Sequence, residues 1–198
     1  MVKPSAEKIA QLRSAIEHWD SQHSEPLIDH DEEERLAPIK RKAVALINHR
    51  ARSSSELRSR LLDQGFEEPL VDRVVNLCLS NGMIDDQSFA REWVRQRSRN
   101  QKKSAAVLRR ELAQKGISER QIEDALELID EGQQQSIMEE LIDKKAQSLT
   151  HSPADRKEYD KFLRRMVGVA ARRGFPQGAS VAYAKVALER RIDELGQP

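Results

Sequence analysis

The chain has 198 residues, of which 34% are charged, 38% are hydrophobic and only 4% are aromatic. So few bulky apolar residues argue against one large spherical core and favour several small helical cores with broad wet surfaces. The formal net charge of +1 excludes a uniformly cationic or anionic protein, so any attraction to nucleic acid has to come from local clusters of charge.

Cysteine usage and hydropathy indicate the compartment. Cys78 is the only cysteine and lies in an apolar run, which excludes an intramolecular disulfide and is typical of a buried thiol. No apolar stretch approaches the roughly 20 residues of a membrane span. The N-terminus also lacks the apolar region of a secretory signal. We therefore expect a cytoplasmic protein that makes no membrane contact.

The first 37 residues differ in character from the rest. Apolar residues at helical spacing predict a short helix from about Ser5 to Trp19. Residues 25–34 then hold six carboxylates and no Lys or Arg, a composition that favours a flexible acidic linker. The apolar face of the predicted helix comprises Ile9, Leu12, Ile16 and Trp19.

From residue 38 onward nearly every segment reads as helix. Pro38 suits the first turn of one helix, and Ser53 with Glu56 has capping-box spacing for the start of the next. Gly65 and Gly82 suit helix C-termini, where a left-handed backbone favours glycine. No stretch combines strict alternation with β-branched residues, so we predict no sheet.

An internal repeat organises these helices. Residues 56–75 match residues 107–126 at a constant offset of 51, through a helix, a glycine and a second helix. In the second copy Ser118 and Gln121 form a further capping box. The matched pairs are Leu57 and Leu108, Leu61 and Leu112, Gly65 and Gly116, Phe66 and Ile117, Val71 and Ile122, and Val75 and Leu126.

A weaker third copy covers residues 162–188, with Gly174 placed 58 residues after Gly116. Ser152 is expected to cap its middle helix, with Pro153 in the first helical position and Asp155 in the first turn. The predicted fold is all-α, with tandem three-helix units in three copies stacked into an elongated curved array. The expected organisation is an N-terminal extension over residues 1–37 and three units over residues 38–82, 83–131 and 132–198. A stripe down the last helix comprises Val181, Ala184, Leu188, Ile192 and Leu195.

Motifs of catalysis are missing from the sequence. The five histidines show no metal-ligand spacing, and there is no phosphate-binding loop, dinucleotide fingerprint or nucleophile elbow. We therefore expect a protein that is not an enzyme and uses no cofactor or metal.

Local basic clusters are the candidate binding surface. Residues 91–110 carry eight basic side chains against one acid, a density that favours phosphate binding over a merely solvated helix face. Residues 121–143 instead hold eight carboxylates and neither Lys nor Arg, so the chain carries patches of both signs. Arg97 falls within the apolar stripe of its helix. The candidate DNA- or filament-binding residues are Arg91, Arg95, Arg99, Lys102, Lys103, Arg109, Arg110, Arg164, Arg165, Arg172 and Arg173.

The segment GMIDDQSFAREWV, residues 82–94, lies between two helix–glycine–helix units and closely resembles the signature of the RecX family of recombinase regulators. The resemblance spans about residues 38–192. Either Asp85 or Asp86 is expected to cap the next helix, so the signature reads mainly as structural. Its residues are Gly82, Ile84, Asp85, Asp86, Phe89 and Ala90.

This resemblance implies a function. Proteins of the RecX family are tandem three-helix repeats that bind the RecA filament in its groove on DNA and inhibit strand exchange, ATP hydrolysis and coprotease activity. The partners implied are the RecA filament and single- and double-stranded DNA without sequence preference, and we expect a monomer. Two alternatives are a helix-turn-helix DNA-binding protein of the transcription-factor type and a scaffold that binds only proteins.

Overall fold

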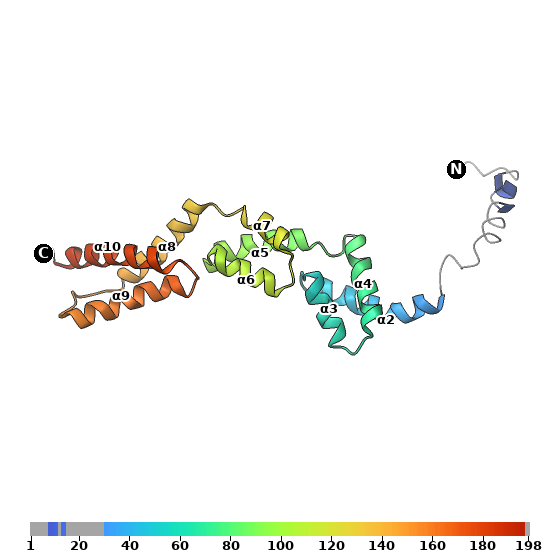
Figure 1. The fold of residues 1–198 in the computed structure, drawn as a ribbon, viewed down its shortest axis with the longest axis horizontal. Coiled ribbons are helices and arrows are strands. Elements are labelled where there is room, and N and C mark those ends of the chain that lie inside the picture. The colour runs from blue at the N-terminus through green and yellow to red at the C-terminus, as the bar shows by residue number, and fades with distance from the viewer. Residues whose placement is uncertain (1–7, 12, 15–29, 197–198) are drawn as a thin grey trace.

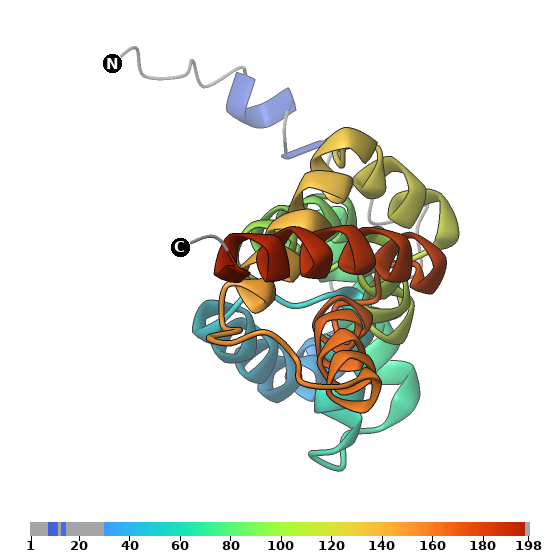
Figure 2. The same cartoon turned by 90° about the vertical axis from the view of Figure 1, so that its left-hand side faces the viewer.

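A computed structural model describes residues 8–11, 13–14 and 30–196, and every regular element in these residues is helical (Figure 1). The helices form bundles that follow one another along the long axis of the molecule, and a view along that axis shows the bundles behind one another (Figure 2). Of the predicted N-terminal helix, residues 8–11 and 13–14 are helical and Ile9 is exposed. Leu12, Ile16 and Trp19 lie outside the described residues.

The first unit consists of α2 (His30–His49), α3 (Ser54–Leu62) and α4 (Glu68–Ser80). The capping box predicted at the start of α3 is present: the Ser53 hydroxyl accepts from the backbone N–H of Glu56, whose side chain accepts from the Ser53 N–H. Each helix directs one apolar stripe inward, which makes a single core. That core comprises Leu36, Ile39, Ala43, Leu57, Leu61, Val71, Val74, Val75, Cys78 and Ile84.

The start of this unit differs from the sequence prediction. Pro38 lies inside α2 rather than in its first turn, and residues 30–37 are helical rather than a flexible linker. The helix extends backward because Leu36 is almost fully buried on the same face as Ile39. The acids at 31–33 then fall in the first turn, where the helix dipole favours negative charge. Pro38 is exposed, so water can replace the backbone hydrogen bond that proline cannot donate.

The second unit repeats the first with α5 (Asp86–Gln101), α6 (Ala105–Gln114) and α7 (Glu119–Leu126). Ser104 and Ser118 are the N-cap residues of α6 and α7. The core is again one cluster, made by Ala90, Val94, Leu108, Leu112, Ile117, Ile122, Ala125 and Leu126. These positions include the apolar residues that the offset of 51 aligns with the core of the first unit, so the repeat reflects a shared packing pattern.

The third unit consists of the longer helices α8 (Glu131–Ala146), α9 (Arg156–Ala171) and α10 (Gln177–Gly196), packed around Phe162, Met166, Ala184 and Leu188. The predicted cap of α9 was wrong. Asp155, not Ser152, is the N-cap residue, and it accepts from the backbone N–H of Glu158. Pro153 precedes the helix because the Glu158 carboxylate turns back to bond the free N–H of Ala154.

The first two units meet at the N-terminus of α3. The buried Ser53 hydroxyl donates to the Lys115 carbonyl over 2.6 Å, at the turn that Gly116 makes with φ +72°. From the first helix of the second unit, the Asp86 carboxylate accepts from the N–H and the hydroxyl of Ser54. The helix end that carries free N–H groups is thus capped by the following unit.

The second and third units meet in the same way. The Ser104 hydroxyl donates to the Gly174 carbonyl over 2.8 Å, and its N–H donates to the Arg173 carbonyl. Gln134, from the first helix of the third unit, accepts from the N–H of Ala105. A serine at the start of one middle helix and a glycine turn in the next unit therefore form the joint in both places.

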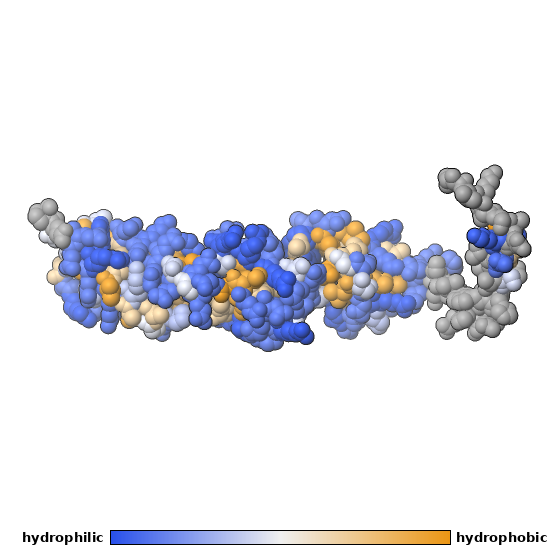
Figure 3. All heavy atoms as spheres, turned by 90° about the horizontal axis from the view of Figure 1, so that it is seen from above, coloured by the Kyte–Doolittle hydropathy of each residue, from blue (hydrophilic) through white to orange (hydrophobic). Residues whose placement is uncertain are grey.

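The expected all-helical fold of three-helix units is confirmed, with one hydrophobic cluster for each group of three helices. The face of the molecule seen from above is largely hydrophilic with separate hydrophobic patches (Figure 3). Within the described ranges no helix is long and apolar enough to cross a membrane. The same part of the chain brings no three His, Cys, Asp or Glu side chains together as a metal site.

Acid is expected to weaken the first joint through Glu56. Burial alone would raise the pKa of Glu56, but hydrogen bonds from Arg50 and from Lys115 of the second unit lower it to about 2. Since the unfolded chain has a value of about 4.3, the stabilisation is complete above about pH 5 and is lost as the pH falls toward 2. Urea unfolding should show the wild type losing about 1–2 kcal/mol more than Glu56→Gln between pH 5 and pH 2. Parallel losses in the two proteins would contradict this assignment.

Candidate nucleic-acid interface

The signature segment begins by closing the first unit. Gly82 adopts φ +73° after α4, and the N–H of Ile84 donates to the Cys78 carbonyl over 3.1 Å. Ile84 is buried in the first core. Asp85 is the N-cap residue of α5, and its carboxylate accepts from both the hydroxyl and the backbone N–H of Ser88. These hydrogen bonds, the one from the hydroxyl first, hold the pKa of Asp85 below its usual range.

The rest of the signature joins the first unit to the second. Asp86 does not cap its own helix but reaches back to Ser54 in the first unit. Ala90 is fully buried in the second core and Phe89 packs against it. The six signature residues therefore lie where the chain passes from the first unit to the second and where the two units pack together. Their contacts support a structural role for the motif.

Most candidate cations on α5 and α6 are paired with carboxylates of the same chain. Arg95 makes two hydrogen bonds to Glu92, at 2.6 and 2.7 Å. Lys102 pairs with Glu140 of the third unit, so it belongs to the second joint. The remaining pairs are Lys103 with Glu111, and Arg109 with Glu119 and Glu123.

Arg97 and Arg173 are engaged in another way. The guanidinium of Arg97 lies 3.8 Å from the centre of the Trp93 ring, so this side chain covers the apolar stripe of its helix. The Arg173 Nε donates to the Gln101 carbonyl over 2.9 Å. Arg173 thereby helps to hold the third unit against the end of α5.

Besides Arg173, six candidate residues have no ion pair in the described part of the chain. They are distributed over α5, α6 and the α9 segment, and only the last of these carries several of them close together. The six are Arg91, Arg99, Arg110, Arg164, Arg165 and Arg172.

The outward face of α9 is basic along its whole length. Phe162, Met166 and Ala170 point to the third core, and the opposite side of the helix carries cations at helical spacing. The face spans about 22 Å from its first to its last cation at 1.5 Å per residue. We call this surface the α9 basic face, and it comprises Lys157, Lys161, Arg164, Arg165 and Arg172.

A polar hollow of about 240 Å³ adjoins this face at the loop between α8 and α9. Lys161 and Arg165 line it from the helix, and Thr150 and His151 line it from the loop. The one acid in its wall, Glu158, is already bonded to the N–H of Ala154. These donors and cations can hold an anionic group such as a backbone phosphate.

Lys157 and Lys161 belong to a second basic stretch of the sequence, residues 156–173, but were not among the candidate binding residues. Two acids, Glu158 and Asp160, interrupt this stretch, which lowers its apparent charge density. Both acids are bonded within the chain: Asp160 pairs with Arg156, and the Glu158 carboxylate accepts from the N–H of Ala154. A helical projection of residues 156–172 was the signal that could have found both lysines.

Comparison with known proteins places these features in a family. Residues 40–76 match the first three-helix domain of RecX, and residues 85–126 match the second. A regulatory protein RecX of Corynebacterium efficiens is 42% identical over 196 residues, covering 97% of this chain and 93% of that protein. One of Mycolicibacterium vanbaalenii is 35% identical, covering 74% of this chain and 82% of that protein. The crystal structure of RecX from Lactobacillus salivarius shares the fold with a TM-score of 0.65, at 20% identity over 79% of this chain and 98% of that one.

Proposed function

Because the chain belongs to the RecX family of regulatory proteins, we propose that it is a negative regulator of a RecA-type recombinase. In this proposal it lies along the groove of the RecA–DNA filament and inhibits strand exchange, ATP hydrolysis and coprotease activity. It acts by binding, in the cytoplasm, without a cofactor.

The α9 basic face is the observation that carries the nucleic-acid part of this proposal. Its five cations have no acidic partner among the described residues, so binding phosphate requires no internal ion pair to break. A recognition helix presents Asn, Gln and Ser together with Arg to base edges, whereas the α9 basic face carries only Arg and Lys, which are suited to phosphates. The face therefore favours contact with DNA of any sequence over the alternative of a site-specific transcription factor.

The test is ATP hydrolysis by the recombinase on single-stranded DNA with increasing amounts of this protein. We expect the rate to fall as the protein approaches the recombinase in concentration, because each bound molecule occupies part of the filament groove. Unchanged hydrolysis at an excess of this protein would refute the proposal. Footprinting on genomic fragments separates the alternative, since one discrete protected site would favour a transcription factor.

A further inference from the structure

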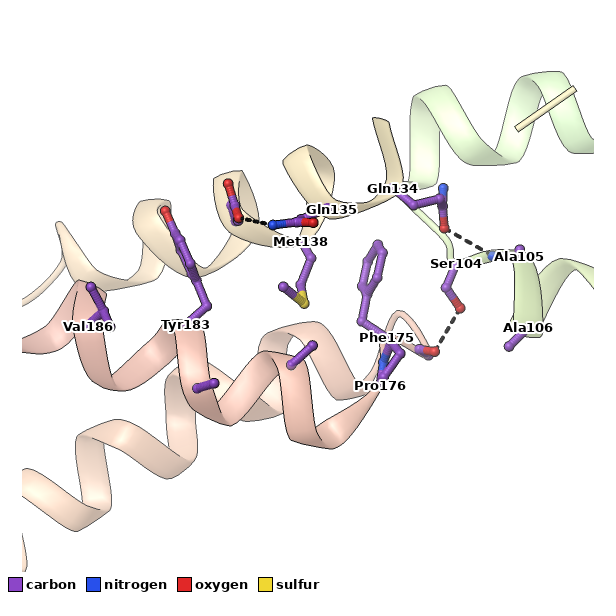
Figure 4. A pocket seen from close by; sticks show the side chains of 14 residues that line it. Ser104, Ala105, Ala106, Gln134, Gln135, Met138, Phe175, Pro176, Tyr183 and Val186 are labelled. Carbon is purple, nitrogen blue, oxygen red and sulfur yellow. Dashed lines mark hydrogen bonds between the residues drawn. The ribbon is translucent and has the colours of Figure 1, made fainter. Parts of the chain in front are cut away.

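An apolar groove of about 700 Å³ runs along the joint between the second and third units. Met138 of α8 and Phe175, just before α10, form its floor, and Tyr183 and Val186 of α10 continue its wall (Figure 4). The start of α6 closes one end, where Ser104 bonds the Gly174 carbonyl. The groove therefore lies on a rigid seam rather than on a loop.

At the corresponding place in the second unit a polar bridge joins its first and last helices. There the Gln87 amide of α5 donates to Asp124 of α7 over 3.2 Å. Gln135 and Ala182 occupy the same places in the third unit. Ala182 follows Gly174 at the spacing at which Asp124 follows Gly116. Gln135 comes directly after Gln134, as Gln87 comes directly after Asp86, and Gln134 and Asp86 are the residues that accept from the preceding unit. Alanine cannot accept the bond, and Gln135 instead donates to Glu139 on its own helix. The third unit therefore lacks this bridge beside the groove.

Apolar side chains stay exposed in this opening. Val186 is 60% exposed, and Ala179 and Ala182 are exposed beside it. A contiguous apolar hollow on so charged a protein marks an interaction site. At its inner end the Ser104 hydroxyl is bonded to Gly174 and the Gln134 Oε1 accepts from the N–H of Ala105, whereas the Gln134 Nε2 is buried and has no hydrogen-bond partner among the described residues. Apart from that amide few polar groups are left to orient a small molecule, so an apolar protein segment fits better.

Charge narrows the identity of that segment. Glu139 is the only charged residue in the wall of the groove, and its carboxylate accepts a hydrogen bond from the neutral Gln135 amide. No cation in the described residues pairs with Glu139. A Lys or Arg of a partner would find an unneutralised carboxylate directly beside the apolar surface.

We propose that this groove receives a short amphipathic helix of a partner protein, with apolar residues in the groove and a Lys or Arg beside them paired with Glu139. A volume of about 700 Å³ accommodates a few aliphatic side chains. Two successive turns of a helix present such a set at i, i+3 or i+4, and i+7. The inference rests on the proposed function in its choice of partner, a subunit of the recombinase filament.

The experiment compares the full-length protein with the double variant Ala179→Gln and Ala182→Asn. These neutral amides give the groove the kind of polar lining that the second unit has at Gln121 and Asp124, without changing the net charge. The control carries Ala113→Gln and Ala45→Asn, on exposed positions of α6 and α2. Binding is measured by fluorescence anisotropy to the recombinase assembled on single-stranded DNA and, separately, to the bare DNA.

We expect the groove variant to bind the filament at least tenfold more weakly than the control, with unchanged binding to bare DNA. Glu139→Lys should also weaken filament binding, because it places two cations together. Equal filament binding by groove variant and control, or an equal loss on bare DNA, would overturn the groove assignment and leave the proposed function standing. Failure of the wild type to bind the filament would refute the proposed function and this inference with it.

Discussion

Replacing Gly116 with alanine is expected to lower the free energy of unfolding by about 3 kcal/mol. Two effects add at this position. The backbone has φ +72°, a left-handed conformation in which a side chain costs about 1–2 kcal/mol. An added methyl group would also overlap the Cβ atom of Ser55 in the preceding unit, and that atom is fixed to its own backbone. Relieving the overlap costs about 1–3 kcal/mol more.

Gly65 is the matched control for this change. It has φ +83° at the equivalent turn of the first unit, but no heavy atom of the described residues lies within 4 Å of an added methyl group. Gly65→Ala should therefore cost only the backbone contribution of about 1–2 kcal/mol. Urea unfolding of both variants measures the difference, which is the contribution of close packing at the joint. Equal destabilisation by Gly116→Ala and Gly65→Ala would show that the joint adapts to the added methyl group, and would contradict a close approach between Gly116 and Ser55.

Replacing Arg165 and Arg172 together with alanine is expected to weaken binding to double-stranded DNA by about 10–100-fold at 0.1 M salt. Both belong to the α9 basic face and have no ion pair in the described residues. If each neutralises one phosphate, the slope of log K against log salt concentration falls by about 0.9 apiece. Titrations at three or more salt concentrations measure both quantities.

The control variant replaces Arg95 and Arg109, two arginines that the structure pairs with carboxylates. The change in net charge is the same, but these guanidinium groups have to leave Glu92 and Glu123 before they can reach a phosphate. We expect the salt dependence to change by less than in the α9 variant. A larger change in the control would move the interface back to α5 and α6, where the sequence had placed most of it.

Several helix boundaries could be read from the sequence because short-range interactions set them. The capping boxes at Ser53 and Ser118 use a side chain and a backbone N–H three residues apart. The boundaries that were predicted wrongly lie where a contact with a distant residue outweighed a local preference. Residues 30–37 are helical because the burial of Leu36 outweighs the repulsion within an acidic run.

The candidate site was less predictable because charge density in the sequence says nothing of pairing. Lys102 and its partner Glu140 lie 38 residues apart, and both fall in segments that looked like single-sign patches. Folding brings these patches together at the second joint, where each neutralises part of the other. On α9 the interspersed acids are bonded elsewhere, Asp160 to Arg156 and Glu158 to the N–H of Ala154, so the cations of the α9 basic face keep no acidic partner among the described residues.

The sequence by itself determined the repeating helical units, since hydrophobic periodicity, capping residues and glycine turns act within a few residues of one another. Only the tertiary structure decided how the units join and which surfaces remain open. Asp86 caps a helix of the preceding unit, and Ala182 lines an apolar groove at the place where Asp124, one unit earlier, bonds to Gln87. Both roles depend on residues far away in the chain, because a hydrogen bond or an apolar contact is set by distance in space.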